Sequence, residues 1–291
     1  MNPAASDARL VLRRPGAPGT VVPLAGPRGA IALGGRDFVV MAGPCAVEDP
    51  AQIEESAREV AEAGCAVLRG GAFKPRTSPY AFQGLGADGV RLLLEAARRN
   101  GLAAVTEVMD AAQLPALEGV ALLQVGARNM QNFTLLQALA RLRRPVLLKR
   151  GPAATVDEWL LAAEYLLAGG NDQVVLCERG IRTFETATRN TLDLSSVALV
   201  KQRTHLPVIV DPSHASGRPE LVVPLSLSAA AAGADGLLVE VHPRPEEALC
   251  DGHQALRPRE LRELTDRLAP LLDAVGRTLW RPEPARRTAA R

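Results

Sequence analysis

Short runs of aliphatic residues recur along the chain, and each is followed by polar residues and then by a segment with helical periodicity. Continuous apolar runs of this length are typical of strands that are buried on both faces, as in parallel sheets. Eight such runs are present, at residues 38–41, 66–68, 103–106, 121–125, 145–148, 173–176, 207–210 and 236–239. The pattern therefore predicts eight buried strands that alternate with helices.

Helix start signals lie between these runs. Asp49 is a candidate N-cap in front of a proline, and Thr155 and Glu158 have the spacing of a capping box. The segment 258–275 also opens on a proline and has apolar residues at helical spacing. Pro270 lies inside this last segment, where we expect it to kink or break the helix.

Eight strand–helix units in roughly 250 residues predict an α/β fold, a single (β/α)8 TIM barrel. We place the barrel at residues 37–276, an N-terminal arm with one short strand or hairpin at 1–36, and a C-terminal tail at 277–291. The alternative is an open doubly wound sheet. Such a sheet would carry a G-x-G-x-x-G turn after its first strand, and this sequence has none there.

The composition of the 291 residues limits the classes of binding partner and the cellular compartment that we expect. A net charge of +2 gives no reason to expect a nucleic-acid or membrane partner, and no window approaches about 18 consecutive apolar residues. The N-terminus lacks the apolar segment of a secretory signal. Four widely spaced cysteines are not a disulfide framework in a chain of this length, so we expect a reduced, cytoplasmic protein.

The active site of a barrel lies at the carboxyl ends of its strands, so the residues that follow each run are the candidates. All eight runs end in polar or ionisable residues, and the cations among them are Arg69, Lys74, Arg76, Arg128, Lys149 and Arg179. Converging like charges are costly unless anions neutralise them, and guanidinium groups match phosphate and carboxylate. These cations predict a site for small phosphorylated carboxylates. The alternative is ordinary pairing along the rim, with Glu107, Glu178 and Asp211 as the acids within reach.

Lysine is rare enough in this chain to be informative. Only three of the 34 basic residues are lysines, and Lys74 and Lys149 both follow predicted strands, whereas we expect Lys201 at the surface. A compact ammonium group differs from a guanidinium fork in geometry and in proton transfer, which favours specific roles for the first two lysines.

A second group of residues follows the first, seventh and eighth runs and contains a thiol, an imidazole and two carboxylates. Its members are Cys45, His214, Glu240 and Asp251. The first and last strands of a closed barrel are neighbours, so these side chains can meet, and mixed sulfur, nitrogen and oxygen donors suit a divalent transition metal. Each residue also has a plain structural interpretation, such as a core cysteine, a backbone-bonded histidine or a turn aspartate.

The remaining histidines and cysteines have weaker signals. We expect His242, which shares a strand face with Glu240, to have a structural or indirect role. Neither His205 nor His253 receives a role. Cys65 and Cys177 are expected to pack in the core.

Several motifs surround the candidate residues: Gly-Pro-Cys at 43–45, Leu-Arg-Gly-Gly at 68–71, Lys-Pro-Arg-Thr-Ser-Pro at 74–79, Phe-Gln-Gly-Leu-Gly at 82–86, Gly-Ala-Arg-Asn at 126–129, Leu-Leu-Lys-Arg-Gly at 147–151, Cys-Glu-Arg-Gly-Ile-Arg-Thr at 177–183, Asp-Pro-Ser-His at 211–214 and Val-Glu-Val-His-Pro at 239–243. In this order they resemble the 3-deoxy-D-arabino-heptulosonate-7-phosphate (DAHP) synthases, type I, Iβ branch, over residues 37–270. The resemblance implies a metal-dependent (β/α)8 enzyme of the shikimate pathway. Such an enzyme condenses phosphoenolpyruvate with erythrose 4-phosphate and releases phosphate.

The resemblance also implies roles for individual residues. The metal ligands would be Cys45, His214, Glu240 and Asp251, with Mn²⁺ as the first choice ahead of Fe²⁺, Co²⁺ and Zn²⁺. Phosphoenolpyruvate would contact Arg69, Lys74, Gly126, Ala127, Arg128, Lys149 and Arg179, and erythrose 4-phosphate would contact Pro75, Arg76, Thr77, Ser78 and Asp251. The residues implied in catalysis are Cys45, Lys74, His214 and Glu107, of which Glu107 would orient or deprotonate the attacking water.

The resemblance implies a homo-oligomer, either a dimer or a tetramer. Residues 1–36 are too short for the ferredoxin-like or chorismate mutase domain of many regulated members, so feedback control would need a separate partner, such as a chorismate mutase, or be absent. Three alternatives stay open. The first is a 3-deoxy-octulosonate-8-phosphate synthase or an amino-sugar variant, and the Lys-Pro-Arg form at 74–76 disfavours the octulosonate enzyme. The second is a Schiff-base aldolase in which Arg150 activates Lys149. The third is a regulatory barrel without turnover.

Overall fold

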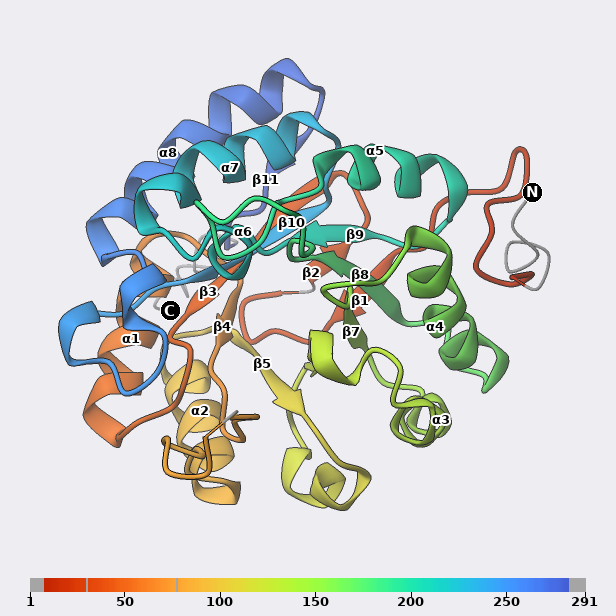
Figure 1. The fold of residues 1–291 in the computed structure, drawn as a ribbon. Helices are drawn as coiled ribbons and strands as arrows, with labels where there is room; N and C mark the ends of the chain where they lie inside the picture. The colour runs from red at the N-terminus through yellow and green to blue at the C-terminus, as the bar shows by residue number, and fades with distance from the viewer. Residues whose placement is uncertain (1–7, 30, 77, 283–291) are drawn as a thin grey trace, which may run out of the picture.

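Eight parallel strands close into a ring in the computed structural model of the chain, which describes residues 8–29, 31–76 and 78–282 (Figure 1). They are β3 (Asp37–Gly43), β4 (Val67–Arg69), β5 (Ala103–Val108), β6 (Leu122–Val125), β7 (Val146–Lys149), β8 (Val174–Glu178), β9 (Val208–Val210) and β10 (Gly236–Glu240). Each strand pairs with the next one in sequence, and β10 pairs with β3 to close the ring. The predicted single (β/α)8 barrel is confirmed, and the open doubly wound alternative is wrong.

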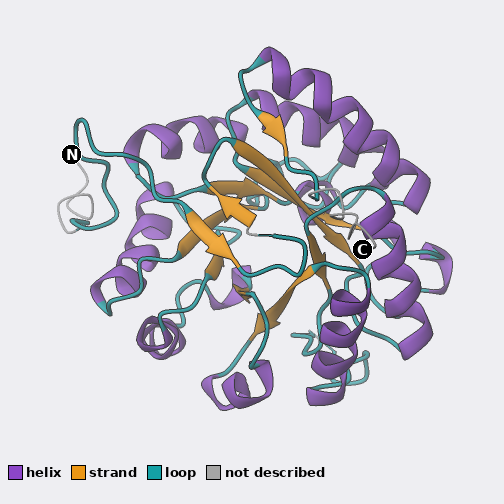
Figure 2. Ribbon diagram, turned by 180° about the vertical axis from the view of Figure 1, so that it is seen from behind, coloured by secondary structure: helices purple, strands orange, loops and turns teal. Residues whose placement is uncertain are grey.

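Helices cover the outside of the ring (Figure 2). They are α1 (Pro50–Glu62), α2 (Ala87–Arg99), α3 (Phe133–Leu142), α4 (Val156–Ala168), α5 (Leu194–Arg203), α7 (Pro219–Ala231) and α8 (Pro258–Ala274). The short helix α6 (Pro212–Ser216) instead follows β9 at the carboxyl end of the strands. Shorter 3₁₀ helices are η2 (Ala111–Leu117), η3 (Ala127–Asn129), η4 (Pro245–Glu247) and η5 (Gly252–Gln254). Within the described part of the chain, no helix combines the length and the apolar character that crossing a membrane requires.

The predicted capping signals start two of these helices. The Asp49 carboxylate accepts hydrogen bonds from the backbone N–H groups of Ala51 and Gln52, which fixes the first turn of α1. Thr155 and Glu158 form the predicted capping box at the start of α4.

Pro270 does not break α8, so a break at this position is ruled out, and the kink stays a prediction. The helix continues through it from Pro258 to Ala274. Leu268 and Leu272, on either side of the proline, are buried against the barrel. The favourable free energy of packing this inner face outweighs the cost of the backbone hydrogen bond that proline cannot donate.

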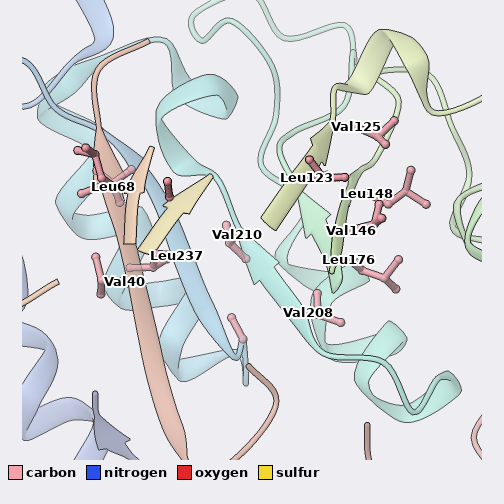
Figure 3. Packing of buried hydrophobic residues seen from close by; sticks show 14 of the residues in the cluster. Val40, Leu68, Leu123, Val125, Val146, Leu148, Leu176, Val208, Val210 and Leu237 are labelled. Carbon is pink, nitrogen blue, oxygen red and sulfur yellow. The ribbon is translucent and has the colours of Figure 1, made fainter. Parts of the chain in front are cut away.

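Side chains along the strands alternate between the inside of the ring and the layer under the helices. Val39 and Met41 of β3 pack inside, whereas Phe38, Val40 and Ala42 pack in the outer layer. Figure 3 shows this outer layer, with aliphatic side chains from several strands around the ring. Because both faces of these strands are buried, each strand appears in the sequence as a continuous apolar run.

A hairpin closes the end of the barrel at which the strands begin. Strands β1 (Val22–Leu24) and β2 (Ile31–Leu33) pair antiparallel, and their buried side chains pack against the interior residues of the ring. Trp280 joins this cluster, and β11 (Thr278–Leu279) pairs with β3. The carboxyl ends of the strands are therefore left as the open mouth of the barrel.

Parts of the predicted arm and tail thus contact the barrel. The backbone N–H groups of Leu10 and Val11 also donate to the Glu164 carboxylate of α4, and β11 lies beyond the barrel end predicted at residue 276. Residues 1–7, 30 and 283–291 lie outside the described residues. The division into arm, barrel and tail stays a prediction.

Gly43, at the carboxyl end of β3, adopts a conformation that L-residues rarely reach. Its φ is 144°, and a Cβ there would overlap the carbonyl oxygen of Arg69. We predict that Gly43→Ala lowers the free energy of unfolding by about 3 kcal/mol in a urea titration. The control is Gly276→Ala, which should cost about 1 kcal/mol, because no atom of the described chain lies within 4 Å of the added Cβ. Equal losses for the two variants would contradict this interpretation.

Candidate active site

The open mouth of the barrel contains a cavity of about 470 Å³, and eight of the residues that line it are cations. All six predicted cations line it, together with Arg182, Arg189 and the predicted residues Pro75, Ser78, Glu107, Gly126, Ala127, His214 and Asp251. Two carboxylates, Glu107 and Asp251, line the cavity with these eight cations, and Asp211 and Glu240 lie beside Lys149 and Arg69. Pairing along the rim would need a matching number of acids, so the excess of positive charge favours anionic ligands.

Four of the predicted cations have buried side chains: Arg69, Lys74, Lys149 and Arg179. Lys74 Nζ donates to the carbonyl oxygen of Cys45 at 2.8 Å and lies 2.9 Å from Cys45 Sγ. Arg69 Nη1 lies 3.5 Å from Glu240 Oε2 and has no hydrogen-bond partner among the described residues. A buried guanidinium nitrogen without a partner is costly, so Arg69 fits a site that a ligand completes.

The other two predicted cations lie at the rim. Arg76 Nη1 contacts Cys250 Sγ, and the exposed Arg128 donates from Nη1 to the Pro75 carbonyl oxygen at 3.3 Å. These contacts connect the 74–78 stretch to the loops after β6 and β10. Thr77, which belongs to the same stretch, lies outside the described residues.

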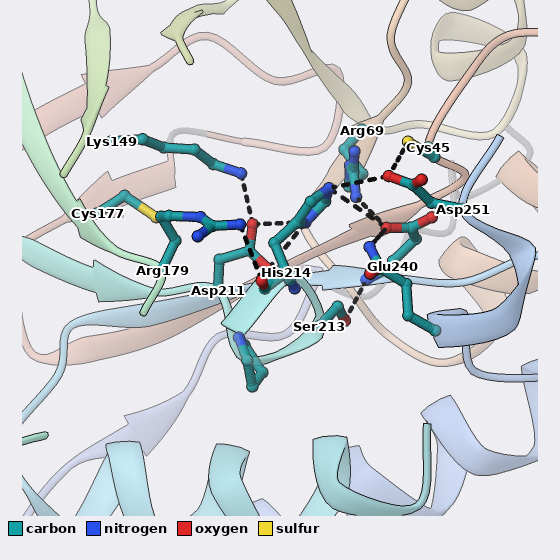
Figure 4. Close-up of polar contacts among 12 residues, drawn as sticks. Cys45, Arg69, Lys149, Cys177, Arg179, Asp211, Ser213, His214, Glu240 and Asp251 are labelled. Carbon is teal, nitrogen blue, oxygen red and sulfur yellow. Dashed lines mark hydrogen bonds and ion pairs between the residues drawn. The ribbon is translucent and has the colours of Figure 1, made fainter. Parts of the chain in front are cut away.

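The donor atoms of the second predicted group converge beside the cavity (Figure 4). One atom each of Cys45, His214, Glu240 and Asp251 lies within 4.8 Å of all the others. His214 Nε2 is 3.5 Å from Glu240 Oε2 and 4.0 Å from Asp251 Oδ2. Glu240 Oε1 is buried and has no hydrogen-bond partner among the described residues, so this carboxylate keeps an oxygen free for a cation. The four residues fit a divalent transition metal.

The acid–base properties of this four-residue cluster reflect its burial. Burial raises the pKa of Glu240 well above its ordinary value, and the neighbouring Cys45 adds to the shift. The hydrogen bond with Cys250 and burial raise the pKa of Cys45 to about 11. The two sulfur atoms are 3.2 Å apart, and the same contact lowers the pKa of Cys250 to about 7. A divalent cation would stabilise the ionised thiol and carboxylates, which otherwise repel one another.

Asp211 connects the four-residue cluster to the anion pocket. Its buried carboxylate accepts from the backbone N–H of His214 at 3.0 Å, lies 2.9 Å from His214 Nδ1 and forms an ion pair with Lys149 (Figure 4). Burial alone would raise the pKa of Asp211, but His214, Lys149 and Arg69 hold it well below its ordinary value. Since Nδ1–H of His214 points at Asp211, a neutral imidazole presents the Nε2 lone pair to the cluster.

Arg150 and Glu178 follow the strands in sequence but turn away from the pocket. Arg150 Nη1 lies 3.0 Å from Glu178 Oε2 and 2.9 Å from Asp193 Oδ2. Adjacent residues of a strand point to opposite faces, so Arg150 lies on the other side of β7 from Lys149. The expectation that Glu178 is within reach of the pocket cations is therefore wrong, and so is the expectation that Arg150 activates Lys149. The Lys149 ammonium group is paired with Asp211 instead.

Other expectations had mixed outcomes. His242 lies outside the four-residue cluster, and Cys65 and Cys177 are buried in the core as predicted. The Lys201 side chain is partly exposed, as expected, and its ammonium group also pairs with buried Asp235 at 2.7 Å, just before β10.

The sequence did not predict several residues that line the pocket. Cys250 lies beside a predicted ligand, and Gln124 Nε2 donates to Glu107 Oε2 at 3.3 Å. Arg182 and Arg189 enter the pocket from the loop after β8. Arg182 was within reach of prediction, since it belongs to the 177–183 motif, whereas no sequence signal singles out Gln124.

Fold and site together define a class of enzyme, a (β/α)8 barrel whose mouth combines an anion pocket with a cluster of metal-type donors. The sequence model of the DAHP synthetase I family matches residues 21–274. The chain belongs to this family. Its activity is that of a DAHP synthase, an enzyme of the shikimate pathway.

Two relatives from Thermotoga maritima have names that agree with this assignment, and a third relative has a different name. A phospho-2-dehydro-3-deoxyheptonate aldolase from Thermotoga maritima is 51% identical over 249 residues, which cover 85% of this chain and 74% of the relative. The crystal structure of a DAHP synthase from T. maritima superposes with a TM-score of 0.89 at 48% identity, over 94% of this chain and 79% of that chain. A 2-dehydro-3-deoxyphosphooctonate aldolase from Syntrophotalea carbinolica is 32% identical over 242 residues, covering 77% of this chain and 86% of the relative.

Removal of the Asp211 charge would leave Lys149 buried without a counter-ion. We predict that Asp211→Asn lowers the free energy of unfolding of the metal-free protein by about 3–5 kcal/mol at pH 7. The control Asp88→Asn, at an exposed position, should change it by less than about 0.5 kcal/mol.

The pH dependence of this loss follows from the lowered pKa of Asp211. The stabilisation is complete above the ordinary carboxyl pKa and is lost as the pH falls through the lowered pKa of the folded state. The difference between wild type and Asp211→Asn in urea titrations should therefore shrink below about pH 4. A difference that stays constant with pH would count against the ion pair.

Proposed function

We propose that this enzyme condenses phosphoenolpyruvate, erythrose 4-phosphate and water to DAHP and inorganic phosphate, and that it needs one divalent metal ion. The observation that supports the proposal is the meeting of an eight-cation pocket and a four-residue donor cluster at one barrel mouth. The reaction brings together two phosphorylated substrates, one of which is also a carboxylate. A preformed cationic site offsets their repulsion and holds them in one orientation.

The buried part of the pocket suits phosphoenolpyruvate, because buried cations are positioned by their surroundings and exclude water from a carboxylate or phosphate. We assign to this substrate the buried cations Arg69, Lys74, Lys149 and Arg179, together with Gly126, Ala127 and the exposed Arg128. The rim suits the sugar phosphate, to which we assign Pro75, Arg76, Thr77, Ser78 and Asp251.

Cys45, His214, Glu240 and Asp251 would hold the metal ion. We choose Mn²⁺ first, with Fe²⁺, Co²⁺ and Zn²⁺ as alternatives, because the order of affinities does not decide which ion a site holds in cells. When bound, such an ion supplies Lewis-acid chemistry at an aldehyde oxygen. The Nδ1–H contact with Asp211 keeps His214 in the tautomer that can act as a ligand.

Glu107 is assigned to the water molecule that attacks phosphoenolpyruvate. Its carboxylate lines the cavity, and a Cβ at Gly126 would overlap its Oε1 atom. The missing side chain at Gly126 therefore makes room for this carboxylate. A carbon–carbon bond forms between C3 of phosphoenolpyruvate and the aldehyde carbon, water adds at C2 with loss of a proton to Glu107, and phosphate leaves. Lys74 can donate the proton that the aldehyde oxygen gains.

A 3-deoxy-octulosonate-8-phosphate synthase is the second candidate, since a relative with such a name is 32% identical to this chain. The Lys-Pro-Arg form at 74–76 and the 51% identity to a heptonate enzyme favour the four-carbon aldose. We further propose a cytoplasmic homo-oligomer, a dimer or a tetramer, whose feedback control comes from a separate chorismate mutase.

Phosphate release with a panel of aldose phosphates tests the proposed function. With phosphoenolpyruvate and Mn²⁺, we expect turnover with erythrose 4-phosphate to exceed that with arabinose 5-phosphate by about tenfold or more. Excess chelator should abolish turnover, and added Mn²⁺ should restore it. Full activity in excess chelator would contradict the metal dependence, and faster turnover of the five-carbon sugar would favour the second candidate.

A further inference from the structure

Gln254 lies behind the four-residue cluster and contacts one of its members. The side chain is fully buried, Nε2 donates to Glu240 Oε2 at 2.7 Å, and Oε1 accepts from Arg189 Nη1 at 2.9 Å. Arg189 Nη1 also lies 3.6 Å from Asp251 Oδ2. One buried amide therefore joins a guanidinium group of the β8 loop to a carboxylate of the cluster.

The backbone around this amide is held in place. Asp251 has a φ of 53°, which is uncommon for a residue with a side chain, and a Cβ at Gly252 would overlap a backbone oxygen of η4. Beyond Gln254, the N–H of Leu256 donates to the Glu240 carbonyl oxygen at 2.9 Å. The turn that presents Asp251 to the cluster thus also fixes Gln254.

Arg189 reaches the cluster from a loop that is docked on α6. Backbone N–H groups of Arg189 and Asn190 donate to carbonyl oxygens of α6 at 2.9 and 2.8 Å, and Asn190 Nδ2 donates to the His214 carbonyl oxygen at 3.3 Å. The loop therefore contacts His214 through the backbone, Asp251 directly and Glu240 through Gln254.

The charges on either side fix the orientation of the amide. Its donor end faces a carboxylate, and its acceptor end faces a guanidinium group. A flipped amide would place oxygen against oxygen at Glu240 and N–H against N–H at Arg189. The amide is also neutral, so it holds the carboxylate without adding charge to a cluster that already contains several ionisable groups.

We propose that Gln254 is a positioning residue of the metal centre, which holds Glu240 ready for the divalent ion and couples it to Arg189. The inference rests on the proposed function, because it requires that the cluster binds a metal. Residues that hydrogen-bond to metal ligands orient them, and their loss typically weakens metal binding about 10–100-fold.

Calorimetric titration of the apoenzyme with Mn²⁺ alone tests this inference. Gln254→Met keeps the length of the side chain without its hydrogen bonds, and it should raise the Mn²⁺ Kd about tenfold or more. Arg189→Met should also raise Kd. Because one amide relays part of that effect, the double variant should lose less affinity than the product of the two single losses.

The control is Asn171→Leu, which removes another fully buried amide. Asn171 Nδ2 donates to the carbonyl oxygens of Leu139 and Arg144, ahead of β8 and away from the mouth. This variant should melt at a lower temperature and bind Mn²⁺ with the wild-type Kd. A loss of affinity in Asn171→Leu as large as that in Gln254→Met would show a general effect of destabilisation and overturn the inference.

The wild-type titration distinguishes a failure of the proposed metal dependence from a failure of the role proposed for Gln254. A wild-type apoenzyme that binds no Mn²⁺ would overturn the metal dependence and this inference with it. A wild type that binds Mn²⁺, together with an unchanged Kd in Gln254→Met, would overturn the inference alone. Should Gln254→Met fail to fold, Arg189→Met decides, because this side chain is 35% exposed. An unchanged Kd there, or strictly additive losses in the double variant, would overturn the coupling.

Discussion

The buried contact of Asp211 with both Lys149 and His214 holds the two halves of the barrel mouth together. Burial of any one of these charges alone would cost several kcal/mol. The carboxylate stabilises the Lys149 ammonium group in the anion pocket and orients the His214 imidazole in the four-residue cluster. One buried carboxylate therefore joins the anion pocket to the four-residue cluster.

Around this contact, the mouth keeps charges that the folded chain does not neutralise. Arg69 Nη1 and Glu240 Oε1 are buried without hydrogen-bond partners among the described residues, and the cations of the pocket outnumber its carboxylates. Such an arrangement lowers stability, and the rest of the barrel offsets it through its two apolar layers and the hairpin that closes the other end. Unpaired polar atoms at one end of a well-packed barrel are expected where ligands complete the structure.

The sequence predicted the strands because both faces of each strand are buried, which leaves a continuous apolar run. It also predicted where the cations and metal-type donors meet, since parallel strands bring their carboxyl ends to one edge. The sequence did not predict contacts that depend on the direction of a side chain or on residues distant in the chain. Arg150 points away from Lys149 because neighbouring residues of a strand point to opposite faces. Gln254 contacts Glu240 through a turn that no local sequence pattern specifies. The ion pair of Lys201 with Asp235 was out of reach for a similar reason, since the two residues lie far apart in sequence.

In the proposed function, one barrel mouth holds the metal and phosphoenolpyruvate side by side. A crystal structure of the enzyme with Mn²⁺ and phosphoenolpyruvate, with anomalous data at the manganese edge, tests it most directly. We expect one anomalous peak among Cys45, His214, Glu240 and Asp251. We also expect electron density for phosphoenolpyruvate in contact with Arg69 and Lys149. A manganese peak elsewhere, or phosphoenolpyruvate bound away from these cations, would contradict it.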